Sequence, residues 1–280
     1  MPSPDRFLLA AVMGWPISQS RSPMLHNYWF EKHGLAGSYV PLAVEPAGLR
    51  VALRALPALC FSGCNLTIPH KEAALAIVDR VDPLARRIGA MNCVVVAADG
   101  SLTGQNHDAF GFVESVREVQ PGWRADAGPI VVIGAGGGAR AVLVGLIDQG
   151  ANEIRLINRT RARGEALQRD LGGPITPLAW SDRAAALEGA AMLVNTTSQG
   201  MMGEPPLDLA LDRLPARALV SDIIYIPRET PLLAAARQRG NPTVNGLGML
   251  LHQARPAFHA WFGVMPQVTP ELRAMIEATT

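Results

Sequence analysis

Ile130-Val131-Val132-Ile133-Gly134-Ala135-Gly136-Gly137-Gly138-Ala139-Arg140 is the most informative stretch of the chain. Its four branched apolar residues predict a buried strand that ends at the glycines, and residues 138–149 then have the pattern of a helix. Residues 153–158 form a second apolar run, so the segment predicts a strand–helix–strand unit with parallel strands. A strand, a glycine turn and a helix in this order are typical of sites where a pyrophosphate binds backbone amides at a helix N-terminus.

Each position of the glycine turn would have its own task. Gly134 would permit the tight turn, Gly136 would let the backbone approach a phosphate, and Ala139 would let the helix pack closely. An ordinary glycine turn without a ligand has a similar composition and is the alternative. The predicted cofactor-binding residues of this segment are Gly134, Ala135, Gly136, Gly137, Gly138 and Ala139.

The end of the next predicted strand, Asn158-Arg159-Thr160-Arg161-Ala162-Arg163, indicates which dinucleotide would bind. NAD sites usually carry an acidic residue at this point, which accepts the ribose hydroxyls, and the segment has none. Arg159, with Asn158 and Thr160 as donors and Arg163 one helical turn later, would instead pair with a 2′-phosphate. The segment therefore predicts NADP, and a solvated arginine cluster is the alternative.

Length and composition place this unit in a larger α/β chain. The chain has 280 residues, beyond the size at which single cores usually stop growing, so two domains are expected. The 49% hydrophobic content comes largely from Ala, Leu and Val, which favours buried parallel strands and covering helices. Strand and helix patterns alternate before the glycine turn as well. They include a helix that Ser22 would cap and a helix from Pro69 toward Val78.

Charge and cysteine content exclude several classes of protein. The formal net charge is +1 with arginines mostly scattered, so we expect neither a nucleic-acid nor a membrane surface. Cys60, Cys64 and Cys93 are odd in number, and neither a disulfide framework nor a zinc quartet can be built from them. The apolar run of residues 7–13 is too short for a signal peptide. A cytoplasmic protein without a metal is expected.

Two polar segments before the glycine turn suit a small polyhydroxylated ligand. They are Gly63-Cys64-Asn65-Leu66-Thr67-Ile68-Pro69-His70-Lys71-Glu72 and Gly104-Gln105-Asn106-His107-Asp108-Ala109-Phe110-Gly111-Phe112. A lysine amine close to a carboxylate can move a proton to and from an alcohol while hydride passes to a nicotinamide. Lys71 and Asp108 are therefore the catalytic candidates. Taken singly, a solvated lysine and an aspartate that caps a helix are the alternatives.

Taken together, these and further motifs resemble the shikimate dehydrogenase family over essentially the whole chain. The motifs occur in the family's order. They are Ser20-Arg21-Ser22-Pro23, Asn65-Leu66-Thr67-Ile68-Pro69-His70-Lys71-Glu72, Gly89-Ala90-Met91-Asn92, Asn106-His107-Asp108, the glycine turn, Asn158-Arg159-Thr160, Asn195-Thr196-Thr197-Ser198-Gln199-Gly200-Met201, Asp222-Ile223-Ile224-Tyr225 and Gly248-Met249-Leu250-Leu251-His252-Gln253-Ala254.

The resemblance implies a role for each matching position. Lys71 would be the acid and base at the reacting hydroxyl, with Asp108 as its hydrogen-bonded partner. The substrate carboxylate would be held by Ser20, Ser22 and Tyr225, and the ring hydroxyls by Thr67, Asn92 and Gln253. The residues that would line the NADP site are the glycine turn with Asn158, Arg159, Thr160, Arg163, Thr196, Ile223 and Gly246.

Four positions depart from the family's usual residues, namely Trp15, Cys93, His107 and Asn245. None of them removes a proposed catalytic group. His107 adds a titratable side chain beside Asp108 and so puts the pH profile in doubt, although a loop histidine more often points to solvent.

The resulting prediction is a two-domain α/β fold with a cleft between the domains. Residues 1–110 plus 248–280 would form the substrate domain, and residues 111–247 a Rossmann-type NADP-binding domain. The implied activity is NADP-dependent, reversible reduction of 3-dehydroshikimate to shikimate, in a monomer or homodimer whose partner is this small molecule. A quinate or quinate/shikimate dehydrogenase and a non-catalytic ligand sensor on the same fold are the alternatives.

Overall fold

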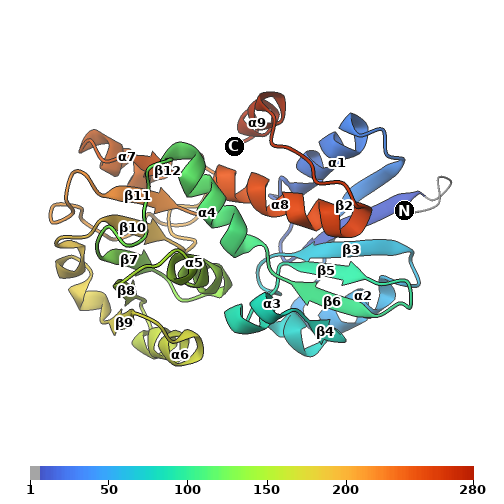
Figure 1. Cartoon of the computed structure of the whole chain (residues 1–280), viewed down its shortest axis with the longest axis horizontal. Coiled ribbons are helices and arrows are strands. Elements are labelled where there is room, and N and C mark those ends of the chain that lie inside the picture. The colour runs from blue at the N-terminus through green and yellow to red at the C-terminus, as the bar shows by residue number, and fades with distance from the viewer. Residues whose placement is uncertain (1–6) are drawn as a thin grey trace. The chain divides into compact units, whose positions relative to one another are not determined.

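The structure, a computed structural model, describes residues 7–280. The chain forms two compact units. The first comprises the described residues up to His107 together with Leu251–Thr279, and the second comprises Asp108–Leu250. Each unit contains its own β-sheet (Figure 1), which confirms the α/β class. No helix within residues 7–280 is both long enough and apolar enough to cross a membrane.

A mixed six-stranded sheet forms the centre of the first unit. Across the sheet its strands are β2 (Gly37–Ala43), β1 (Leu8–Gly14), β3 (Phe61–Leu66), β5 (Cys93–Val96), β6 (Leu102–Gln105) and β4 (Arg80–Val81). β1 pairs in parallel with β2 and β3, whereas β5 runs antiparallel to β3 and β6. The helices of this unit are α1 (Ser22–Lys32), α2 (Leu49–Ala55), α3 (Pro83–Ile88), α9 (Pro270–Glu277) and most of α8 (Gly246–Phe262), with short 3₁₀ turns at Pro46–Gly48 and Ala73–Ala76.

An all-parallel six-stranded sheet forms the centre of the second unit. Across the sheet its strands are β12 (Thr243–Val244), β11 (Leu219–Asp222), β10 (Met192–Asn195), β7 (Ile130–Ile133), β8 (Ile154–Ile157) and β9 (Ile175–Leu178). Numbered within the unit, this is the order 3-2-1-4-5-6 of the Rossmann fold. Its helices are α4 (Asp108–Val119), α5 (Gly137–Asp148), α6 (Arg161–Leu171), α7 (Pro231–Gln238) and the first turn of α8, with 3₁₀ turns at Trp180–Asp182 and Ala185–Leu187.

Both faces of the second sheet are buried, which explains the continuous apolar runs in the sequence. Ile130 and Val132 of β7 lie in one core with residues of α4 and α5. Val131 and Ile133 lie in the opposite core with residues of α7. Because successive side chains of a strand point to opposite faces, β7, which is covered on both sides, is apolar at every position.

Two of the predicted local structures are wrong. No α-helix begins at Pro69, because the Lys71 carbonyl accepts a hydrogen bond from the Met91 amide at 2.9 Å and the Leu75 amide bonds Glu72 at 3.2 Å in a 3₁₀ pattern. Ser22 is not an N-cap, because it is the first residue of α1 and Arg21 occupies the capping position.

A buried carboxylate joins two segments at the carboxyl edge of the second sheet. Asp222, the last residue of β11, accepts hydrogen bonds from Asn195 Nδ2 at 3.1 Å, from the Ile224 amide at 3.1 Å and from Thr230 Oγ1 at 2.8 Å. Thr230 also caps α7 by accepting from the Leu233 amide. The Asn195 carboxamide oxygen in turn accepts from the amide and the hydroxyl of Thr197. One side chain thus fixes the segments that follow β10 and β11.

We expect Asp222 to make stability depend on pH. Burial raises the pKa of Asp222 from 3.8 to about 6, against the opposing hydrogen bonds from Thr230, Ile224 and Asn195. The folded chain therefore binds this proton more tightly than the unfolded chain. The associated stabilisation is fully present below about pH 4 and is lost as the pH rises through about 6. A rise in the pKa from 3.8 to about 6 corresponds to a contribution to the free energy of unfolding on the order of 3 kcal/mol.

Urea unfolding of the wild type and of Asp222→Asn at several pH values between about 8 and 4 measures this effect. The wild type should gain stability relative to the variant as the pH falls, because only the wild type can take up the proton. A difference in the free energy of unfolding that stays constant over the range would contradict the prediction.

Candidate functional site

The carboxyl edge of the second sheet brings four predicted cofactor residues into one row. The first residue after each of β8, β7, β10 and β11 is, respectively, Asn158, Gly134, Thr196 and Ile223. The Gly134 amide bonds the last carbonyl of β8 at 2.8 Å, and the Thr196 amide bonds the last carbonyl of β7 at 2.8 Å. The strand order reverses between β7 and β10, and in open α/β sheets ligands bind outside the carboxyl ends at this point.

The glycine turn leaves room at the N-terminus of α5. Gly134 has φ of +112°, and a Cβ there would lie 2.5 Å from Thr196 Oγ1. Gly136 occupies the N-cap with extended backbone and no side chain caps the helix. A Cβ at Gly136 would meet nothing within 4 Å. The first amides of α5 therefore face open space, as a bound pyrophosphate of NADP requires.

Two arginines without a carboxylate partner lie at the start of α6. Arg159 and Arg163 are exposed, and neither forms an ion pair with any of residues 7–280. Arg161, between them, pairs with Glu165 at 2.9 Å. Asn158 Nδ2 donates to the Thr160 carbonyl at 2.8 Å, which shapes the turn between β8 and α6. A helix N-terminus with two unpaired guanidinium groups suits the 2′-phosphate of NADP.

Gly246 and Ile223 are packed backbone to backbone at the same edge. The Gly246 amide donates to the Ile224 carbonyl at 2.9 Å, and a Cβ on Gly246 would lie 2.1 Å from the Ile223 carbonyl oxygen. Only glycine can begin α8 so close to this loop. Ile223 also approaches the glycine turn, since its Cδ1 would lie 3.0 Å from a Cβ on Gly138.

Two of the predicted substrate residues are hydrogen-bonded to each other in the first unit. Asn92 Nδ2 donates to Gln253 Oε1 at 3.0 Å, and both side chains are buried. Asn92 Oδ1 accepts from the His107 amide at 2.9 Å. Thr67 follows directly on β3, and its amide donates to the Met13 carbonyl at 3.0 Å. Amide and hydroxyl groups of this kind can bind the hydroxyls of a small ligand.

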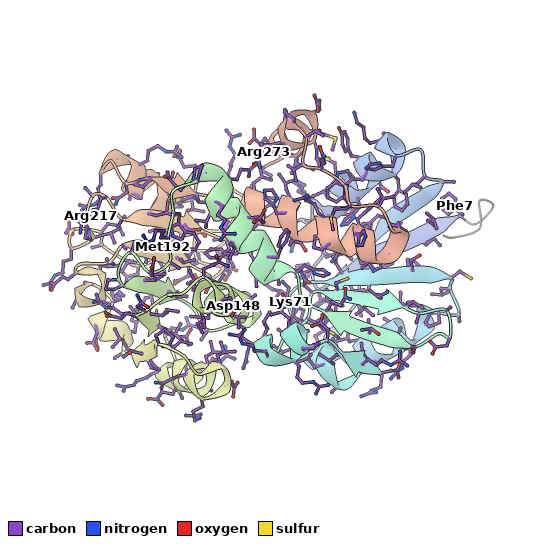
Figure 2. The ribbon with its side chains drawn as sticks, viewed as in Figure 1. Phe7, Lys71, Asp148, Met192, Arg217 and Arg273 are labelled. Carbon is purple, nitrogen blue, oxygen red and sulfur yellow. The ribbon has the colours of Figure 1, made fainter. Side chains whose placement is uncertain are left out.

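Lys71 lies in the turn after β3 and is labelled in Figure 2. The ring of the preceding His70 is buried, and its Nε2 lies 2.8 Å from the Val44 carbonyl oxygen. The Lys71 carbonyl accepts from the Met91 amide, next to Asn92. The backbone that carries the half-buried Lys71 side chain is therefore fixed on both sides.

Ser20 and Ser22 lie at the start of α1. Ser20 Oγ accepts from the Ser22 amide at 3.3 Å, and Ser22 is buried. Arg21, between them, bonds the Thr279 carbonyl oxygen at 2.7 Å through Nη2. This contact ties the beginning of α1 to the C-terminal segment.

Asp108 and Tyr225 belong to the second unit. Asp108 is the buried first residue of α4, and Tyr225 is half-buried in the loop after β11. Their proposed roles beside Lys71 and beside the two serines remain predictions. His107 does not behave as a solvent-facing loop residue, because its Nε2 is buried.

The structure also shows a buried polar pair for which the sequence suggested no role. Tyr39 on β2 donates a hydrogen bond of 2.6 Å to Asn65 Oδ1, and Asn65 Nδ2 donates to the Asn92 carbonyl at 3.0 Å. Asn65 stands in the quoted motif, but Tyr39 lies in an apolar strand without a local signal.

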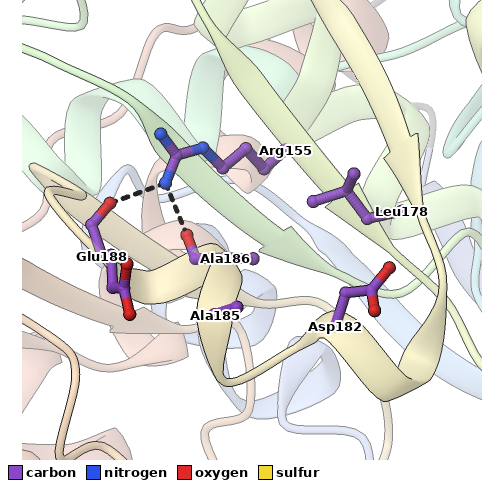
Figure 3. A pocket seen from close by; sticks show the side chains of 6 residues that line it. All are labelled: Arg155, Leu178, Asp182, Ala185, Ala186 and Glu188. Atoms are coloured by element: carbon purple, nitrogen blue, oxygen red, sulfur yellow. Dashed lines mark hydrogen bonds between the residues drawn. The ribbon is translucent and has the colours of Figure 1, made fainter.

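Within residues 7–280, neither a group of metal-ligating side chains nor the cavity shown in Figure 3 overlaps with these sites. Among residues 7–280, no three His, Cys, Asp or Glu side chains are grouped to hold a metal ion. A cavity of about 390 Å³ is lined by Arg155, Leu178, Asp182, Ala185, Ala186 and Glu188 (Figure 3). Its one cationic side chain, Arg155, already bonds the carbonyls of Ala186 and Glu188 at 2.8 and 2.7 Å. This cavity contains none of the predicted site residues.

Family models of known proteins match three parts of the chain. Residues 12–94 match the shikimate dehydrogenase substrate binding domain. Residues 120–203 match shikimate / quinate 5-dehydrogenase, and residues 246–278 match the shikimate 5'-dehydrogenase C-terminal domain.

Individual relatives cover nearly the full length. Shikimate dehydrogenase (NADP(+)) of Paramagnetospirillum magneticum is 56% identical over 268 residues, which are 96% of this chain and 97% of the relative. The crystal structure of shikimate 5-dehydrogenase from Thermus thermophilus in complex with NADP(H) and shikimate is 35% identical with a TM-score of 0.84 and covers 98% of both chains. Quinate dehydrogenase from Corynebacterium glutamicum in complex with NAD is 30% identical with a TM-score of 0.89, covering 97% of this chain and 99% of that one. The chain belongs to the shikimate dehydrogenase family.

Proposed function

We propose that this protein catalyses the NADP-dependent, reversible reduction of 3-dehydroshikimate to shikimate. The observation that carries the proposal is the 56% identity, over almost the full length of both chains, to a relative named Shikimate dehydrogenase (NADP(+)). The open helix N-terminus at Gly136 and the unpaired guanidinium groups of Arg159 and Arg163 support the choice of NADP.

Proton transfer is assigned to Lys71 and Asp108. The glycine turn with Arg159 and Arg163 would hold NADPH, which when bound would supply the hydride for reduction of the ring ketone. Lys71 gives a proton to the oxygen of the forming alcohol and takes it back in the reverse direction, and Asp108 orients the amine by hydrogen bonding. The fixed backbone on either side of Lys71 favours this role, because general acids act only from a defined position.

Substrate binding is assigned to two groups of side chains. Ser20, Ser22 and Tyr225 bind the carboxylate through hydroxyl donors, and Thr67, Asn92 and Gln253 bind the ring hydroxyls. The partner is thus a small molecule. We further propose that the protein works in the cytoplasm as a monomer or homodimer.

Oxidation assays of shikimate and quinate, each with NADP and with NAD, test the proposal directly. Efficient turnover of shikimate with NADP is the expected result. The structural similarity to a quinate dehydrogenase makes quinate the second candidate, and turnover of quinate with NAD in preference to shikimate would establish it. No turnover of either acid would favour a ligand sensor on the same fold.

Replacing Lys71 by Met should lower kcat by roughly 10²- to 10⁴-fold, the usual worth of a positioned acid or base. The apparent affinity for shikimate should change much less, because the amine acts on the reacting oxygen. Lys32→Met is a matched control, since Lys32 and Lys71 are the two lysines of the chain and Lys32 is exposed at the end of α1. Asp108→Asn should also lower kcat strongly. Undiminished kcat in both Lys71→Met and Asp108→Asn would refute the assignment.

Two alanine substitutions in the glycine turn should separate folding from cofactor binding. Gly134→Ala should lower the unfolding temperature, because φ is +112° and the new Cβ would clash with Thr196. Gly136→Ala should leave the unfolding temperature near that of the wild type, since its Cβ would enter open space with an ordinary φ of −102°. The methyl group would nevertheless occupy the space of the pyrophosphate, so the Kd for NADPH should rise about 10-fold or more, a loss of ~1.4 kcal/mol. Unchanged NADPH affinity in Gly136→Ala, measured by fluorescence titration, would place the pyrophosphate elsewhere.

Cofactor preference should depend on Arg159 and Arg163. Charge-assisted bonds to the 2′-phosphate are worth roughly 2 to 4 kcal/mol together, about 30- to 1000-fold in kcat/KM for NADPH over NADH. The double variant Arg159→Ala, Arg163→Ala should lose most of this preference while its use of NADH stays nearly constant. Arg161→Ala is the control, because that guanidinium pairs with Glu165. A double variant that keeps the full preference would overturn the assignment.

A further inference from the structure

Tyr39 is a polar residue in the interior of the first unit. Its side chain is 1% exposed, and its hydroxyl donates a 2.6 Å hydrogen bond to Asn65 Oδ1. Burial raises the pKa of the phenol well above 10.0, and a hydrogen bond with Ser22 opposes the rise. The hydroxyl therefore keeps its proton and remains a donor at any physiological pH.

This donor sets the orientation of the Asn65 carboxamide, which is the first of a row of buried carboxamides. Because Asn65 Oδ1 accepts from Tyr39, Asn65 Nδ2 is directed to the Asn92 carbonyl, at 3.0 Å. Asn92 Nδ2 donates to Gln253 Oε1, also at 3.0 Å, and Asn92 Oδ1 accepts from the His107 amide. Tyr39, Asn65, Asn92 and Gln253 thus form one connected row, in which Asn65 holds the backbone of Asn92 and the His107 amide sets the direction of the Asn92 carboxamide. Because Gln253 Oε1 accepts from Asn92, the NH₂ group of Gln253 points away from Asn92.

The ring of Tyr39 is held in place from the other side. His26 stacks on it with a centroid separation of 4.1 Å and an interplanar angle of 9°. His26 is fully buried among aromatic rings that include Trp29, Phe258 and Trp261. Burial lowers its pKa to about 3, so the stacked ring is neutral. The Tyr39 hydroxyl accordingly has little freedom to leave Asn65.

We propose that Tyr39 is a positioning residue for the substrate site: through Asn65 it holds the backbone carbonyl of Asn92 in place, and with it the carboxamides of Asn92 and Gln253 that would bind the ring hydroxyls. The proposal rests on the proposed function, because it assumes that these two carboxamides bind shikimate. It adds a specificity device, since a carboxamide recognises a ring hydroxyl only at hydrogen-bonding distance and angle. Once the Tyr39 hydroxyl is removed, the Asn65 carboxamide can rotate, and its oxygen would then face the Asn92 carbonyl oxygen and repel it.

The matched pair Tyr39→Phe and Tyr28→Phe tests the proposal. Each variant loses one phenol hydroxyl in the same unit, and Tyr28 lies outside the row, with its hydroxyl 3.0 Å from Thr269 Oγ1. Tyr39→Phe should raise KM for shikimate about 10-fold or more, equivalent to ~1.4 kcal/mol, with a smaller change in kcat and an unchanged KM for NADP. Tyr28→Phe should keep the wild-type KM for shikimate. Equal KM values for the two variants would overturn the proposal.

Ligand analogues separate positioning from a merely structural role. Shikimate analogues that lack one of the two non-reacting ring hydroxyls should bind the wild type more weakly than shikimate does. Tyr39→Phe should reduce this discrimination for at least one analogue, because the oriented group no longer recognises the missing hydroxyl. A structural defect would weaken shikimate and all analogues by the same factor, and that result would also overturn the proposal.

A double variant covers the case in which Tyr39→Phe does not fold. Tyr39→Phe combined with Asn65→Ala removes the donor together with its acceptor, so no buried acceptor is left without a partner. If Tyr39 acts through Asn65, the double variant should have the KM for shikimate of Asn65→Ala within about twofold, whereas a multiplied effect would contradict the proposal. Failure of the wild type to oxidise shikimate would refute the proposed function itself. A wild type that oxidises shikimate, with no distinct effect of Tyr39→Phe, would refute only this inference.

Discussion

The parallel hydrogen bonding of β8, β7, β10 and β11 is the constraint on which the second unit depends. It aligns the four strand ends, so that the residues immediately after them emerge at one edge. Gly134 makes this alignment possible, because its φ of +112° turns the chain toward α5 and it has no Cβ that would clash with Thr196. Any side chain at this position would have to displace the end of β10. The place where a dinucleotide can bind therefore follows from the parallel register of the strands and from the lack of a Cβ at Gly134.

In the first unit, side-chain hydrogen bonds rather than aligned strand ends bring the proposed binding residues together. Its strands are partly antiparallel, so they do not all end at one edge, and Asn92 makes the connections instead. The Asn92 carbonyl accepts from the Leu66 amide and from Asn65, while its carboxamide joins His107 to Gln253. A single buried asparagine thereby joins β3, the segment before α4 and α8. Buried carboxamides are costly unless fully hydrogen-bonded, and the density of partners around Asn92 meets that condition.

Local signals predicted most of the fold, and contacts between distant segments account for what they missed. The helix Gly137–Asp148 lies within one residue of the predicted 138–149, and the strand Ile154–Ile157 lies inside the predicted run 153–158. The strand before the glycine turn is likewise correct, because glycine and branched residues act through their own backbone. The helix expected from Pro69 fails for a non-local reason, since the Lys71 carbonyl bonds Met91 twenty residues away. Periodicity also does not reveal that His107 Nε2 is buried or that the Tyr39 hydroxyl bonds Asn65. Family motifs point to the individual site residues, but the hydrogen bonds that orient them required the structure.

Both units place buried polar groups next to the proposed binding residues, at a cost in stability. Burial of Asp222 favours the protonated form of its carboxyl group, as the raised pKa of about 6 shows. Hydrogen bonds from three donors lower the pKa of Asp222 and so favour its ionised form near neutral pH. The donors belong to the end of β10 and to the loop after β11. The charge therefore destabilises the fold while it orders the loops. Tyr39 differs, because its phenol keeps its proton and its bond to Asn65 orients that carboxamide without a buried charge. An apolar residue at either position would avoid the desolvation of a polar group and would leave the neighbouring carboxamides free to rotate. The retention of polar groups at both places is best explained by the orientation they impose on binding residues rather than by stability.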